Sequence, residues 1–186
     1  GNTSIADVAK SMKAGDLHGV IIIGGNPAYD APGDLDMATA IASMRISVHL
    51  SGDANETSEV CKWHINRAHW MESWSDGRSA DGTLCIAQPL IQPLFGGLSP
   101  AEFLAVLSAE ETTDSHTLVR TTFDPSADRW NAPWRSAVHD GVVANTATLE
   151  TPPVNRTWSG GLYKVGGTGS KLPAVVFVPS GGVWDG

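Results

Sequence analysis

The amino-acid sequence predicts an α/β protein: a Rossmann-like three-layer domain with a mainly parallel sheet, followed by an irregular, Gly- and Pro-rich C-terminal part. Val20–Ile23 is a continuous β-branched run that ends at Gly24, which is typical of a strand buried on both faces of a sheet. A second apolar run, Arg45–Leu50, follows a helical pattern. Strand, helix and strand within about 33 residues is the size of one parallel βαβ unit with a right-handed crossover. We therefore expect residues 1–150 to form the Rossmann-like domain and residues 151–186 an irregular extension.

Capping patterns predict the helices of the N-terminal half. Thr3 or Ser4 can cap a first amphipathic helix, and Gly15 ends it. Asp34–Met44 is expected to be the crossover helix, with its Asp as the N-cap. Asn55 is placed to cap a short helix directly after the second strand.

The middle of the chain is dense in aromatic residues and turn signals. Trp63–Trp74 has no regular period, and we expect Trp70 and Trp74 to be buried packing anchors. Thr83–Ala87 is expected to be a short third strand. Gln88–Phe95 is expected to be extended, because each Pro biases the residue before it away from helix.

Signals for the start and end of helices predict the structure of the chain from Ser99 onward. Ser99 and Glu102 form a capping box that starts a helix, with Pro at its first position. Its expected buried face consists of Phe103, Val106 and Leu107. Further helices are expected over Asp114–Phe123 and over Trp130–Val138. Gly141 stops the last helix, and Ala174–Val178 is the expected strand of the extension.

Composition excludes several functions. The formal charge is −8 and no run of Lys or Arg is present, which argues against a nucleic-acid partner. No apolar stretch approaches the roughly 20 residues of a membrane helix, so direct membrane insertion is not expected. The sequence begins with Gly rather than Met and carries no signal-peptide pattern, so we expect a piece of a longer or processed protein.

Common catalytic motifs are missing from the sequence. Gly24–Tyr29 does not match the Gly-x-Gly-x-x-Gly dinucleotide fingerprint, and neither a phosphate-binding loop nor a Gly-x-Ser-x-Gly nucleophile elbow occurs. Potential metal ligands gather at Cys61, His64, His69 and Glu72. Zinc and iron sites need three or four convergent ligands, and the aromatic residues between these four favour packing, so we expect no metal. Whether Cys61 pairs with Cys85 stays open.

Three segments together resemble the molybdopterin oxidoreductases of the dimethyl-sulfoxide-reductase superfamily. Residues 18–32 carry a strand, then Gly-Gly-Asn-Pro and Tyr-Asp-Ala-Pro. Residues 55–76 begin with Asn-Glu-Thr and end with Trp-Met-Glu-Ser-Trp-Ser-Asp, and residues 88–97 read Gln-Pro-Leu-Ile-Gln-Pro-Leu-Phe-Gly-Gly. This combination most resembles the molybdopterin-oxidoreductase-like iron–sulfur subunit of alternative complex III, a bacterial quinol-oxidising membrane complex.

The resemblance implies a site and a setting. In molybdenum members, the turn after the first strand and the loop after the second line a molybdopterin guanine dinucleotide. The matching positions here are Gly24, Gly25, Asn26, Pro27, Asp53, Glu56 and Thr57. In the alternative complex III subunit the molybdenum site is expected to be vacant, so the resemblance implies a scaffold with no catalytic residue and no cofactor of its own.

The parent protein is expected to hold iron–sulfur clusters elsewhere in its chain. Its expected partners are other subunits of a membrane-bound respiratory complex, on the periplasmic side of a bacterial membrane. Two alternatives stay open. The chain could be part of an active molybdenum oxidoreductase and contribute to binding of molybdopterin guanine dinucleotide, or it could be a free-standing module that binds a small ligand at the Gly24 turn.

The two candidate turns should meet. Gly24–Pro27 and Ser51–Thr57 both follow strands of one βαβ unit, so they should emerge at the carboxyl edge of the sheet, where such sheets bind ligands. Neither turn contains Lys or Arg, and acidic residues surround both: Asp30, Asp34, Asp53 and Glu56. The sequence therefore predicts a shallow site that repels a phosphate-bearing ligand.

Overall fold

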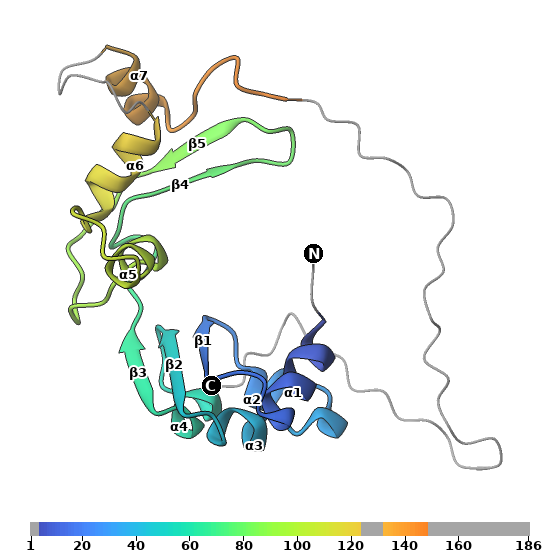
Figure 1. Ribbon diagram of the computed structural model, residues 1–186. Coiled ribbons are helices and arrows are strands. Elements are labelled where there is room, and N and C mark those ends of the chain that lie inside the picture. The colour runs from blue at the N-terminus through green and yellow to red at the C-terminus, as the bar shows by residue number, and fades with distance from the viewer. Residues whose placement is uncertain (1–3, 124–131, 149–186) are drawn as a thin grey trace, which may run out of the picture. The chain divides into compact units, whose positions relative to one another are not determined.

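The computed structural model describes residues 4–123 and 132–148, all within one of two units into which the chain divides, residues 1–150 and 151–186. These residues form a mixed α/β structure, as predicted (Figure 1). A parallel sheet contains β1 (Gly19–Ile23), β2 (Ile46–Ser51) and β3 (Trp63–Asn66), in that order. An antiparallel pair, β4 (Ser75–Arg78) and β5 (Leu84–Ala87), forms a second sheet.

The predicted βαβ unit is confirmed. β1 and β2 are parallel neighbours, with Gly19 opposite Ile46, and α3 (Met37–Ala42) lies between them in sequence. The crossover helix is shorter than the predicted Asp34–Met44, because Asp36 adopts a left-handed φ of 43° and separates α3 from the short 3-10 helix η1 (Gly33–Leu35). A residue with left-handed backbone angles cannot continue a right-handed α-helix, so α3 begins only after Asp36.

The described helices beside the parallel sheet cover one of its faces. α1 (Ile5–Ala14) and α3 supply buried apolar side chains, and Val20 and Ile22 of β1 pack against them. Val60 at the end of α4 (Glu56–Val60) packs against the same cluster. The buried members of this core are Ala9, Met12, Met37, Ala40, Ile41 and Met44.

The expectation that β1 is buried on both faces is wrong for the part of the chain that the structure describes. Ile21 and Ile23 alternate with the half-buried Val20 and Ile22 and are 46% and 41% exposed. The crossovers through α3 and α4 advance in the same direction across the sheet, and right-handed connections of this kind place their helices on the same face. The other face also carries apolar side chains of β2, of which Ile46 at the start of the strand is 52% exposed and Leu50 near its end is buried.

Helix caps agree with the sequence. Ser4 caps α1, Asn55 caps α4 and Ser99 caps α5 (Pro100–Leu107), each with a reciprocal capping box. Gly15 ends α1 at a φ of 78°, in the left-handed region that glycine tolerates. The one-turn helix α2 (Pro27–Asp30) was not predicted, because its sequence also suits a turn.

The second half of the described chain has its own core. α6 (Ser115–Phe123) and α7 (Ala132–Asp140) pack beside β5 around the buried Trp134. The Trp74 ring is half-buried and stacks on Trp134, with the ring centroids 5.9 Å apart.

Two burial predictions in this half are wrong. Trp70 is 63% exposed and its indole lies against the ring of His69, 5.3 Å away, rather than in a core. On α5, Val106 and Leu107 are about half exposed, and Ala105 is buried with Phe103 instead. The predicted positions Trp130 and Ala174–Val178 lie outside the described residues.

Candidate functional site

The two candidate turns meet at the carboxyl edge of the parallel sheet, as predicted. The amide Nδ2 of Asn26 donates a hydrogen bond of 2.6 Å to Glu56 Oε2. Its Oδ1 accepts hydrogen bonds from the Thr57 backbone N at 3.1 Å and the Thr57 hydroxyl at 2.8 Å. One side chain from the first turn is therefore bonded to two consecutive residues at the start of α4.

Thr57 completes this connection from the other side. Its side chain is fully buried, and its Oγ1 accepts a hydrogen bond of 3.0 Å from the backbone N of Ala28. The hydroxyl thus donates to Asn26 and accepts from α2 at the same time. Asn55 Oδ1 also accepts from the Thr57 N, so the cap of α4 is part of the same network.

A buried imidazole lies beneath the two turns. Nε2 of His49 is 3.2 Å from the carbonyl oxygen of Gly25, and Nδ1 is 2.9 Å from the Ser58 hydroxyl. A carbonyl oxygen only accepts, so Nε2 carries the proton and Nδ1 accepts from Ser58. Burial lowers the pKa of His49, and the nearby His64 ring lowers it further, against the opposing hydrogen bond to Gly25. The neutral His49 ring therefore connects the first turn, through the carbonyl of Gly25, to Ser58 in α4.

Arg67 is a site residue that sequence reasoning missed. It follows β3, and its guanidinium lies so close to Gly24 that a Cβ added there would be 2.7 Å from Nη1. Within the described residues, no hydrogen bond or ion pair to that guanidinium is found. Neither turn contains a cation, as the sequence shows, but the structure places the guanidinium of Arg67 beside the first turn. The missing signal was β3 itself, since its four residues show no period that marks a strand.

A small hollow opens beside Arg67. Its volume is about 270 Å³. The lining residues are Gly52, Asn66, Arg67, Glu72, Phe95 and Gly97. It combines one cation, one carboxylate and one aromatic ring at the end of β2 and β3, which is the chemistry of a small polar ligand rather than of a large apolar one.

The other positions that the resemblance implies lie at the same edge of the sheet, where the structure describes them by their backbone geometry. Gly24 and Gly25 both have left-handed φ values, 66° and 68°, and Pro27 is the first residue of α2. Asp53 lies in the loop before α4, where its backbone N reaches the Ser51 hydroxyl at 3.4 Å.

The four potential metal ligands do not form a cluster. Across residues 4–123 and 132–148, no group of three or more His, Cys, Asp or Glu side chains could hold a metal ion. Glu72 instead accepts hydrogen bonds from the backbone N of His69 and of Leu94. Cys61 and Cys85 are both free thiols, and burial raises the pKa of Cys61, which disfavours its thiolate.

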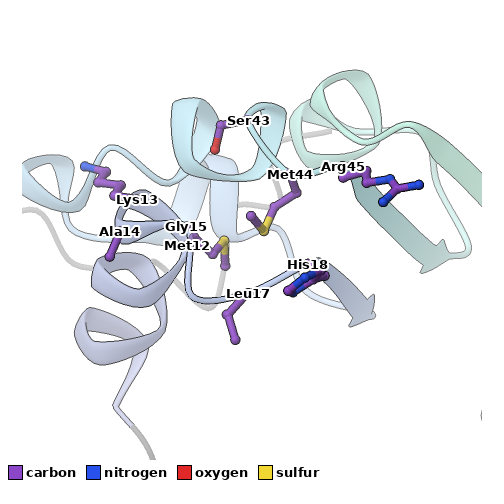
Figure 2. Close-up of a pocket in the computed structure, with 9 residues that line it drawn as sticks. All are labelled: Met12, Lys13, Ala14, Gly15, Leu17, His18, Ser43, Met44 and Arg45. Carbon is purple, nitrogen blue, oxygen red and sulfur yellow. The ribbon is translucent and has the colours of Figure 1, made fainter.

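A larger hollow, about 390 Å³, lies at the opposite, amino edge of β1 and β2 (Figure 2). Its lining includes Lys13, His18 and Arg45. The Lys13 and Arg45 side chains point away from each other, so the cations do not converge on one point (Figure 2). Lys13 belongs to the last turn of α1, where a positive charge complements the helix dipole. The carboxyl edge is therefore the better candidate site.

Comparison with known proteins adds no assignment. Neither the protein-family models nor the curated proteins contain a match to this chain. No helix within the described ranges is long and apolar enough to cross a bilayer.

Proposed function

We propose that this chain is part of a molybdopterin-oxidoreductase-like subunit of a respiratory quinol-oxidising electron-transfer complex, and that it acts there as structural scaffold. One observation carries the scaffold role. Asn26, Glu56 and Thr57, which match cofactor-binding positions by resemblance, are bonded to one another across the two turns.

The mutual bonds oppose binding of a dinucleotide. A ligand that used Asn26 and Thr57 would have to replace four internal hydrogen bonds, each contributing about 0.5–1.5 kcal/mol net. The Glu56 carboxylate would also lie next to any phosphate placed at this turn, and like charges repel at such distances. The network therefore serves best to fix the two turns to each other.

The same proposal specifies the cofactors, the partner subunits and the cellular location. The chain itself would hold no cofactor, and iron–sulfur clusters would lie elsewhere in the parent protein. The partners would be other subunits of a membrane-bound complex on the periplasmic side of a bacterial membrane. Molybdopterin guanine dinucleotide would be bound only if the parent is an active molybdenum enzyme.

A second candidate function is supported by Arg67. Its guanidinium borders Gly24 and the 270 Å³ hollow, and guanidinium groups bind phosphate oxygens in a bidentate manner. On this alternative the edge contributes to nucleotide binding, either within an active molybdenum oxidoreductase or as a free-standing small-ligand module.

Calorimetric titration of the 186-residue chain with GDP separates the two functions. The scaffold proposal expects no binding tighter than a Kd of about 10 μM, which corresponds to roughly 7 kcal/mol. Arg67→Gln is the informative variant, and Arg135→Gln on the exposed surface of α7 is its matched control. Tighter binding that Arg67→Gln abolishes and Arg135→Gln preserves would replace the scaffold role with nucleotide binding. Inorganic pyrophosphate, titrated in parallel, reports whether the guanine is needed.

A further inference from the structure

We propose that two copies of this chain associate through an exposed apolar surface, which we call the 70–95 surface. It consists of the side chains of Trp70, Leu90, Ile91, Leu94 and Phe95, which are between 49% and 81% exposed. Such an accumulation of large apolar side chains exceeds the scattered single residues of an ordinary soluble surface. The inference does not depend on the proposed function.

The 70–95 surface is held in place by its backbone. Leu90 N donates to Met71 O at 2.7 Å, and Leu94 N donates to the Glu72 carboxylate at 3.3 Å. Asn66 Nδ2 donates to the carbonyl oxygen of Phe95 at 3.3 Å. At Gly97 the two segments approach so closely that a Cβ would lie 2.7 Å from Ala68 N. The apolar side chains therefore project from an ordered frame, which lowers the entropy cost of docking.

The lack of a net charge on this surface favours a second copy of the chain as its partner. A two-fold interface places the same patch against itself, so any net charge on the patch would meet its own sign. The chain as a whole carries −8, yet residues 83–101 contain no Asp, Glu, Lys or Arg, and the two charged residues beside Phe95, Arg67 and Glu72, have opposite signs. This surface is thus one that two acidic chains can bring together without direct repulsion.

The available area suits a dimer. At these exposures the five side chains present on the order of 600 Å² per chain, so a dimer that covered all of them would bury on the order of 1,200 Å². That area reaches the lower bound of a stable interface before any polar rim is added. The sheet face that the described residues leave uncovered is a different case, because helical layers normally cover the faces of parallel sheets.

Sedimentation velocity of the full 186-residue chain between 1 and about 200 μM tests the proposal. We expect a reversible monomer–dimer equilibrium that tightens at higher salt, because screening weakens the repulsion between acidic chains. The double variant Leu94→Ser and Phe95→Ser should weaken dimerisation at least tenfold. Both side chains are more than two-thirds exposed, so the fold should be kept, and far-ultraviolet circular dichroism checks this.

The control removes a comparable amount of exposed apolar surface from the sheet. Ile46→Ser with Trp63→Ser should leave the dimer intact. A wild-type chain that stays monomeric at about 200 μM overturns the proposal, as does a dimer that the sheet variant dissociates and the Leu94 and Phe95 variant does not. Assembly beyond the dimer also overturns it, because a two-fold interface closes on itself.

Discussion

Replacing Thr57 by Val tests whether the hydroxyl of this buried residue connects the two turns. Val has nearly the same shape as Thr, so the change removes the polar atom and leaves the packing almost unaltered. Two hydrogen bonds are lost, the 2.8 Å bond to Asn26 and the 3.0 Å bond from Ala28. At about 0.5–1.5 kcal/mol each, their loss should lower the free energy of unfolding by roughly 1–3 kcal/mol.

Urea denaturation followed by circular dichroism measures this change, with an unaltered m-value expected because the compactness of the fold is the same. The corresponding fall in melting temperature is roughly 4–8 °C for about 2 kcal/mol in a chain of this size. Thr39→Val is the matched control, because Thr39 is exposed on α3 and its replacement should change stability by less than about 0.5 kcal/mol.

Combining Thr57→Val with Asn26→Ala refines the test. Residues that share hydrogen bonds are energetically coupled, so the double variant should be less destabilised than the two single effects added together, by about 0.5 kcal/mol or more. If Thr57→Val behaves like Thr39→Val, or if its effect simply adds to that of Asn26→Ala, the reasoning that links the turns through this hydroxyl is wrong.

Three further predictions concern other parts of the described chain. The pKa of His49 is lowered, so the unfolded chain binds this proton more readily. Stability should therefore fall as the pH drops from about 7 through the unfolded pKa of 6.5 toward the folded value, and urea unfolding of His49→Leu should show a smaller pH dependence. Gly24→Ala and Gly25→Ala should lower the melting temperature by similar amounts, because both glycines have left-handed φ values and the Arg67 guanidinium beside Gly24 is the movable end of a flexible side chain; a much larger loss for Gly24→Ala would contradict this reasoning. Trp134→Ala should cost about 3–5 kcal/mol in chemical denaturation, whereas Trp70→Ala should cost less than about 1 kcal/mol, and similar losses would show that exposure does not govern these positions.

Local patterns predicted the fold well where the interaction spans three or four residues. The predicted N-caps at Ser4 and Asn55 and the predicted capping box at Ser99 are all present, because each is complete within one helical turn. The parallel pairing of β1 with β2 also followed, since chain length and crossover handedness leave few alternatives.

What sequence reasoning missed depends on contacts between distant residues. β3 has only four residues, so neither its strand nor the position of Arg67 could be recognised before the register with β2 was known. Trp70 was expected to be buried because large aromatic residues usually are, but its neighbours at the turn leave it facing outward. The mutual bonding of Asn26 and Thr57 likewise appears only when the two turns are placed together.

Among the residues that the structure describes, helices cover the parallel sheet on one side only, which has a consequence for handling the protein in solution. The uncovered face carries the exposed side chains of Ile21, Ile23 and Ile46, and it lies beside β1, the edge strand of the sheet. An apolar face next to an edge strand favours non-specific association between chains. The surplus of eight negative charges keeps such faces apart at neutral pH. Acidification removes that surplus by protonating carboxylates, so colloidal stability should be lost in mildly acid buffers before the fold itself gives way.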